Sequence, residues 1–82
     1  MKTIQFGKHK NIISRRLALA REQAKLSQQQ LAAKMQVYGV SIDQQAISKI
    51  ELDKRIVTDY ELVCLCKILN VTLDWMLSDF EY

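Results

Sequence analysis

Apolar residues recur along most of this chain at the three- or four-residue spacing of an α-helix. Ile13, Leu17 and Ala20 would face one side of a helix, and they predict a first helix over residues 11–24. The same spacing returns four more times along the sequence. The inward positions expected in those later segments are Leu31, Ala32, Met35, Ile47, Ile50, Leu62, Leu65, Cys66, Leu69, Leu73, Trp75 or Met76, and Leu77.

Two of the predicted helices begin with a capping box, in which the cap side chain and the side chain three residues later each bond the other's amide. Ser27 with Gln30 marks the start of a second helix near residue 28. Thr58 with Glu61 marks the start of a fourth helix, which the apolar pattern extends to about residue 69.

Single cap residues delimit the remaining segments. Gly39 can take the left-handed conformation at the end of the second helix, and the carboxylate of Asp43 can cap a third helix over residues 44–52. Thr72 would cap a short last helix over residues 73–79. The sequence therefore predicts an all-α fold of five short helices.

Composition agrees with a single folded unit. The chain has 82 residues, 49% of them hydrophobic and 26% charged, with no proline and two glycines. No stretch is long and apolar enough to cross a membrane, and residues 1–7 do not resemble a signal peptide. Cys64 and Cys66 are two positions apart on a predicted helix and so point to different faces, which prevents a low-strain disulfide; we therefore expect free thiols and a cytoplasmic protein. We expect a basic arm over residues 1–10 and a folded domain over residues 11–82.

Charge is distributed unevenly along the chain. The net charge is +3, but the first 25 residues hold seven basic side chains against Glu22 alone. Residues 56–82 hold five acidic side chains against Lys67. This distribution suits a molecule that offers one face to a polyanion, and it equally suits a solvated surface with an uneven bias.

The segment over residues 43–54 predicts a helix with amide side chains at its start and basic side chains at its end. A major groove about 12 Å wide accepts one α-helix, and a glutamine can bond both N6 and N7 of adenine. Gln44 and Gln45 stand where side chains reach base edges, and Ser48 and Lys49 follow one turn later. With the preceding helix, this segment has the outline of a helix-turn-helix.

Several motifs in the expected order resemble the lambda-repressor-like (Xre/Cro-type) helix-turn-helix family over residues 12–78. The resemblance implies a five-helix fold, a homodimer on double-stranded DNA, and a transcriptional regulator, in most cases a repressor. The motifs that carry it are Leu26-Ser27-Gln28-Gln29-Gln30-Leu31-Ala32, Ala46-Ile47-Ser48-Lys49-Ile50-Glu51, Lys54-Arg55, Glu61-Leu62 and Leu69-Asn70-Val71-Thr72-Leu73-Asp74.

The resemblance also implies roles for individual residues. Gln28 matches a phosphate-contacting glutamine, and Lys54 with Arg55 matches a basic loop that grips the DNA backbone. Arg21 and Glu51 match a structural ion pair. Gln44 and Gln45 match base-reading positions, and Lys49 matches a later contact position. Ser48 lies on the same expected exposed face, so we include it among the base-reading residues.

Two departures from the family pattern affect the expected docking. The connection over residues 36–42 is several residues longer than the family's tight turn. Asp53 stands where the family commonly has glycine, and it brings a negative charge beside the predicted phosphate-binding loop.

Other functional classes have less support in the sequence. His9 has no partner at metal-ligand spacing, and no nucleophile–base pair or glycine-rich phosphate loop is present, so we expect neither an enzyme nor a metal or cofactor. A second hypothesis stays open: a protein-interaction adaptor or antitoxin with the same fold, whose fourth and fifth helices bind a protein partner.

Overall fold

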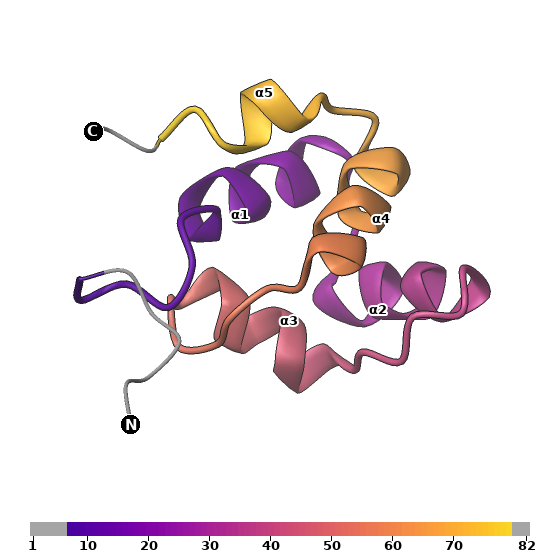
Figure 1. Cartoon of the computed structure of the whole chain (residues 1–82). Helices are drawn as coiled ribbons and strands as arrows, with labels where there is room; N and C mark the ends of the chain where they lie inside the picture. Colours follow the sequence, from indigo (N-terminus) through magenta and orange to yellow (C-terminus); the bar gives the residue numbers. More distant parts are fainter. Residues whose placement is uncertain (1–6, 80–82) are drawn as a thin grey trace.

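The computed structural model describes residues 7–79 as five helices joined by short connections (Figure 1). This confirms the predicted all-α fold. The helices are α1 (Ser14–Gln23), α2 (Gln28–Val37), α3 (Gln44–Glu51), α4 (Asp59–Leu69) and α5 (Leu73–Met76).

The main helix contacts form a closed ring around one core. α3 packs against both α1 and α2, α4 against α2 and α5, and α5 against α1. α5 and α3 lie at opposite sides of the molecule in Figure 1. Every helix buries at least one apolar side chain in this core, whose members are Ile13, Leu17, Ala20, Leu31, Ala32, Met35, Ile42, Ile47, Ile50, Cys64, Leu65, Cys66, Leu69 and Met76.

All four predicted caps are present. Ser27 and Thr58 each form a complete capping box, with Gln30 and Glu61 respectively. Asp43 accepts a bond from the amide of Ala46 at 2.8 Å, and Thr72 accepts one from Trp75 at 3.0 Å. The starts of four helices therefore follow from local sequence alone.

The first helix begins later than the apolar spacing predicts. α1 starts at Ser14, not at residue 11, because the side chain of Asn11 is used elsewhere. Its Oδ1 accepts a bond from the amide of Ile13 at 3.0 Å, and its Nδ2 donates to the carbonyl oxygens of Ile50 and Arg55. Asn11 thus fixes a turn ahead of α1 instead of continuing the helix.

The last helix is shorter than expected, and one of its predicted core residues is wrong. α5 ends at Met76, and Ser78 donates a bond to the carbonyl of Trp75 where the helix would have continued. Met76 occupies the core, so Leu73 lies on the outer side of α5 and is 43% exposed.

The long connection over residues 36–42 is a loop, not an extension of α2. α2 ends at Val37, and Gly39 takes a φ of +81° that glycine adopts without strain. Ile42 then returns to the core, which places Asp43 at the start of α3.

Candidate nucleic-acid interface

α3 combines a buried face with an open one. Ile47 and Ile50 are fully buried where α3 packs against α1 and α2, and they hold the helix in position. Gln45 and Lys49 lie one turn apart on the opposite side and are exposed. Gln44 and Ser48 are half-buried along the edge of this open face.

A shallow groove runs from the start of α3 to the loop that follows it. It places side chains that can read base edges beside side chains that can contact phosphate. The residues that line it are Asp43, Gln45, Ala46, Lys49, Lys54 and Arg55.

Gln28 connects the start of α2 to both ends of α3. Its Nε2 donates to Oε1 of Glu51 at 3.0 Å, and its Oε1 accepts a bond from Nε2 of Gln44 at 2.6 Å. A carboxylate only accepts hydrogen bonds, so Glu51 fixes which end of the Gln28 amide faces Gln44. This chain of contacts holds the Gln44 side chain through two helices.

The same carboxylate forms an ion pair with α1. Arg21 donates from Nε to Oε2 of Glu51 at 2.6 Å and from a second nitrogen to Oε1 at 3.1 Å. It also donates to the carbonyl of Leu26 at 2.9 Å. The hydrogen bonds to Glu51 raise the pKa of Arg21, and its side chain is only 15% exposed. The structure thus places the two residues expected as a structural ion pair in direct contact.

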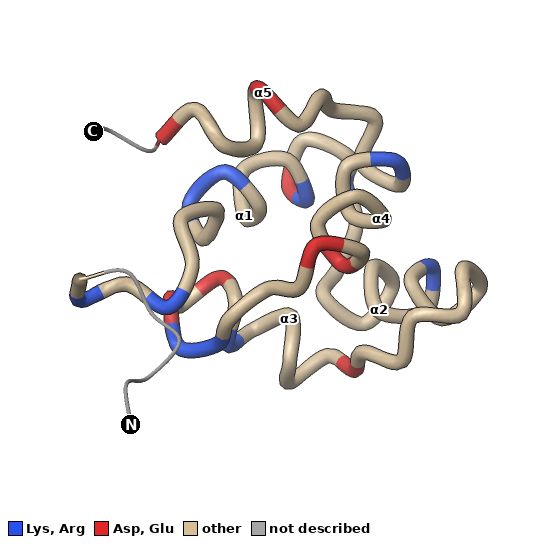
Figure 2. The backbone as a smooth tube through the Cα atoms, viewed as in Figure 1, with Lys and Arg blue, Asp and Glu red and all other residues tan. Residues whose placement is uncertain are grey.

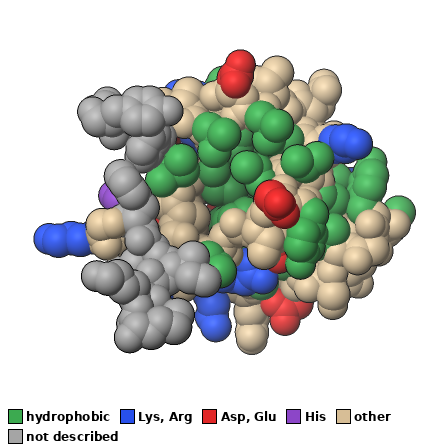
Figure 3. Space-filling view, viewed as in Figure 1, with side chains coloured by type: hydrophobic (Ala, Val, Ile, Leu, Met, Phe, Trp, Pro, Cys, Tyr) green, Lys and Arg blue, Asp and Glu red, His purple; other side chains and the backbone are tan. Residues whose placement is uncertain are grey.

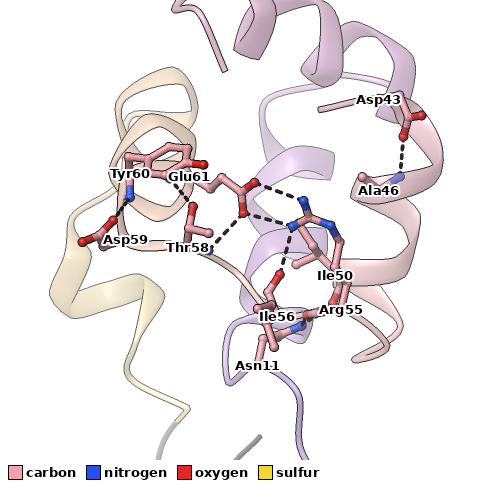
Figure 4. Close-up of polar contacts among 10 residues, drawn as sticks. All are labelled: Asn11, Asp43, Ala46, Ile50, Arg55, Ile56, Thr58, Asp59, Tyr60 and Glu61. Carbon is pink, nitrogen blue, oxygen red and sulfur yellow. Dashed lines mark hydrogen bonds and ion pairs between the residues drawn. The ribbon is translucent and has the colours of Figure 1, made fainter. Parts of the chain in front are cut away.

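The two basic residues after α3 have different surroundings. Lys54 is exposed, whereas the Arg55 guanidinium donates to both carboxylate oxygens of Glu61 at 3.0 and 3.1 Å (Figure 4). Arg55 also donates to the carbonyl of Ile56. Arg55 therefore ties the loop to α4, a role that the sequence did not predict. Its contact with phosphate stays a prediction, as does that of Lys54.

The charge imbalance along the sequence is partly offset by contacts in space. Asp79 pairs with Arg15 at 2.6 Å and with Arg16 at 3.1 Å, so one acidic residue of the last segment faces two basic residues of α1. Lys49 and Lys54 have no carboxylate partner among residues 7–79. The open face of α3 and its loop thus keep cations that the rest of the fold has not paired.

Three polar residues of this region were not foreseen as positioning residues. Asp53, Asn11 and Glu61 each hold a neighbouring segment through hydrogen bonds. Asp53 and Asn11 have partners about 40 positions away, and no local pattern in the sequence connects residues so far apart. Glu61 was predicted as a capping residue, but only the tertiary structure shows its second partner, Arg55.

Other kinds of site have no support in the described part of the chain. Residues 7–79 contain no cluster of side chains suited to hold a metal ion, and none of their helices is long and apolar enough to span a membrane. Cys64 and Cys66 are free and buried, and burial raises the pKa of both thiols. Buried thiols of this kind are unreactive.

Comparison with protein-family models identifies the family of this chain. A family model described as helix-turn-helix matches residues 17–76, which run from within α1 to the end of α5 and include the whole groove beside α3. No curated protein matches the chain.

Proposed function

The chain belongs to the lambda-repressor-like helix-turn-helix family of DNA-binding regulators, and we propose that it binds a specific DNA site as a dimer and represses transcription there. Repression needs no further surface, since a protein bound at a promoter excludes polymerase by occupying the DNA. The observation that carries the proposal is the outer face of α3, with Gln44 held in place and Gln45 and Lys49 exposed.

Gln44 keeps the hydrogen-bonding groups that base reading requires. Its amide nitrogen carries two hydrogens, and only one of them is used by Gln28. The other hydrogen and Oε1 remain as a donor–acceptor pair, which matches N7 and N6 of adenine. Because Gln28 already fixes this side chain, little conformational entropy is lost on binding.

We assign the remaining site residues by their position around the groove. Gln45, Ser48 and Lys49 read bases along the open face of α3, and Lys54 contacts phosphate at its end. Gln28, at the start of α2, meets phosphate where helix amides favour an anion. Arg55 supports the loop through Glu61 and contributes its charge to the same phosphate-binding surface.

The dimer contact that we propose lies on α4 and α5. Tyr60, Val63 and Leu73 are 61%, 41% and 43% exposed, and Val63 and Leu73 line one groove together with Lys67. Figure 3 shows hydrophobic side chains gathered on this side of the molecule, with an acidic side chain among them and a basic one at their margin. Lys67 and Asp74 are both exposed on these helices and carry opposite charges, so a second copy of the chain offers this surface a partner of matching charge and polarity.

Selection of bound duplexes from a random pool tests the proposal directly. We expect a two-fold repeat with half-sites about one helical turn apart. Gln44→Ala should then cost about 1–3 kcal/mol of binding free energy and weaken the preference for particular bases at one or two base pairs. Lys54→Gln should weaken binding to all DNA sequences alike. It should also make the negative slope of log K against log salt shallower by about 0.9.

Lys34→Gln serves as the matched control for Lys54→Gln. It removes the same charge from α2, beside α4 and away from the groove of α3. Equal losses of DNA affinity in the two lysine variants, or unchanged base selectivity in Gln44→Ala, would contradict the assignment of the interface. A stoichiometric protein partner in purified material that enriches no DNA would instead favour the adaptor function.

A further inference from the structure

The turn ahead of α1 is bound to the loop after α3 by one carboxylate. Asp53 accepts a bond from Nδ1 of His9 at 2.7 Å through Oδ2, and from the amides of Lys10 and Asn11 at 2.9 and 3.0 Å through Oδ1. Neutral imidazole with its hydrogen on Nδ1 and protonated imidazole both donate this bond. The contact therefore does not depend on a charge on His9.

Asn11 adds a second attachment between the same two segments. Its Nδ2 donates to the carbonyl oxygens of Ile50 at 3.0 Å and Arg55 at 2.9 Å, so it bridges the last turn of α3 and the loop beyond (Figure 4). Residues 9–11 are thus held against the end of the helix that we propose reads DNA.

Asp53 makes these contacts from an unfavourable backbone conformation. Its φ is +58°, in the left-handed region that favours glycine. Its amide and that of Lys54 bond to the carbonyls of Ile50 and Lys49, which is the usual termination of a helix on a left-handed residue. Glycine would satisfy this turn with less strain, so the carboxylate is what aspartate adds here.

The anchored turn brings further cations beside the proposed phosphate contact. Lys8 and Lys10 are exposed, as is Lys54 in the loop to which Asp53 ties them. Figure 2 shows one basic position of the turn beside those of the loop after α3, and a second at the outer tip of the turn. The carboxylate of Asp53 itself is turned toward His9 and two amides.

We propose that Asp53 is a positioning residue that anchors residues 8–11, so that Lys8 and Lys10 extend the DNA-phosphate surface of Lys54 beyond the end of α3. This inference rests on the proposed function. It predicts that loss of the Asp53 side chain weakens DNA binding. Charge repulsion alone predicts the opposite, because a carboxylate beside DNA repels phosphate and its removal would strengthen binding.

Two variants separate the anchor from the charge. Asp53→Gly removes all the bonds that the Asp53 side chain makes to residues 9–11 and fits the left-handed backbone. It leaves the Asn11 bonds to Ile50 and Arg55 in place. Asp53→Asn removes the charge but keeps an Oδ1 that accepts from the two amides, and asparagine tolerates the same backbone. Binding is measured on a mixed-sequence duplex of about 30 bp at several salt concentrations, because phosphate contacts do not depend on sequence.

We expect Asp53→Asn to bind at least as tightly as the wild type and Asp53→Gly to bind about three- to tenfold more weakly. The salt slope of Asp53→Gly should fall by about 1–2, the share of two lysines. Lys8→Gln with Lys10→Gln should reproduce that loss in the wild type and add little to it in Asp53→Gly. The amides of Lys10 and Asn11 should also exchange hydrogen faster in Asp53→Gly.

Asp53→Gly binding that is unchanged or tighter, with an unchanged salt slope, would overturn the anchor while leaving DNA binding intact. The anchor is equally overturned if the two lysine substitutions weaken Asp53→Gly as much as they weaken the wild type. A wild-type chain that binds no duplex at all would contradict the proposed function itself, which distinguishes the two failures.

Discussion

At the scale of single residues, three helix ends use a residue other than glycine in the left-handed conformation. Lys25, Asp53 and Asn70 have φ values of +59°, +58° and +56°, and they follow α1, α3 and α4. At each, the next amide bonds back to a carbonyl five residues earlier, as in the ending of α2 at Gly39. Asparagine and aspartate tolerate this conformation through their short polar side chains, whereas lysine has no such compensation.

Lys25→Gly should therefore stabilise the protein. The lysine is exposed and makes no side-chain hydrogen bond among the described residues, so glycine removes the strain without removing a contact. We expect the free energy of unfolding to rise by about 0.5–1 kcal/mol in urea denaturation. Asn70→Gly is the control and should gain less, since asparagine is the best tolerated of the three. A loss of stability in Lys25→Gly would show that the lysine has a role in the fold that its contacts do not indicate.

Residue-level prediction from the sequence succeeded where the partner is local and failed where it is distant. Ser27, Asp43, Thr58 and Thr72 were all placed correctly, because a cap bonds an amide two or three positions away. Asp53 was interpreted as a charge that disturbs the loop. Its actual partners lie 42–44 positions away, at the other end of a packed fold.

At the scale of elements, the start of α4 is the point where the DNA-side loop joins the rest of the bundle. The Glu61 carboxylate accepts a bond from the amide of Thr58 and forms an ion pair with Arg55, and its side chain is 5% exposed. Burial alone raises the pKa of Glu61, but hydrogen bonds from Arg55 and the Thr58 amide outweigh burial and hold the pKa below its ordinary value of 4.5. One carboxylate thus supports both a helix start and the loop.

Stability should therefore fall in acid, and Glu61 should carry part of the loss. The unfolded chain binds its proton at a higher pH than the folded one, so the contribution is complete above about pH 4.5 and is lost as the pH falls through the folded pKa. Glu61→Gln should cost about 2–3 kcal/mol at about pH 7, because it leaves Arg55 without its charge partner. This cost should shrink at about pH 3, as measured by urea midpoints across the range.

Asp59→Asn provides the matched control for this experiment. It removes the same charge within the same first turn of α4, where the exposed Asp59 side chain bonds only the amide of Tyr60. The free energy of unfolding of Asp59→Asn should fall in acid by as much as that of the wild type. A Glu61→Gln variant with an undiminished loss of stability in acid would mean that other carboxylates account for the pH dependence.

Element boundaries show the same division between local and distant causes. α2, α3 and α4 begin where their caps predict, but the first turn of the predicted α1 is displaced by Asn11, whose partners belong to α3 and its loop. The last turn of the predicted α5 is likewise absent, and in its place Asp79 accepts bonds from Arg15 and Arg16 of α1. The spacing of apolar residues predicts where a helix can form, but it does not predict the tertiary contacts that replace a turn at the end of the helix.

At the scale of the whole molecule, contacts join the first helix to the segment after the last one. Arg16 donates to Asp79 and also lies 4.6 Å from the centre of the Trp75 ring, so the segment after α5 is fixed to α1. Two basic residues of the first third of the sequence thus contact one acidic residue of its last third. Which charges are paired within the molecule could be learned only from the folded arrangement, and this is why the sequence did not predict that Arg55 binds Glu61.

α5 lies on the opposite side of the molecule from α3 (Figure 1), and Val63 is not among the residues assigned to DNA, so the proposed dimer contact can be disrupted without changing those residues. Val63→Lys places a charge among exposed apolar side chains beside Lys67, and a two-fold contact would double the resulting repulsion. We expect a single-copy mass by light scattering at concentrations where the wild type has twice that mass. Affinity for one half-site should stay unchanged, while the advantage of a two-half-site duplex should be lost.

Val37→Lys is the control for this variant, since Val37 is 86% exposed at the end of α2 and shares a groove with Lys34 and Tyr38. It carries the same change in charge and size to a different apolar position, so it should leave both the mass and the preference for paired half-sites intact. If Val37→Lys alone dissociates the dimer, the contact lies at the α2–α3 loop. The recognition helices would then approach DNA from a different angle than a contact through α4 and α5 allows.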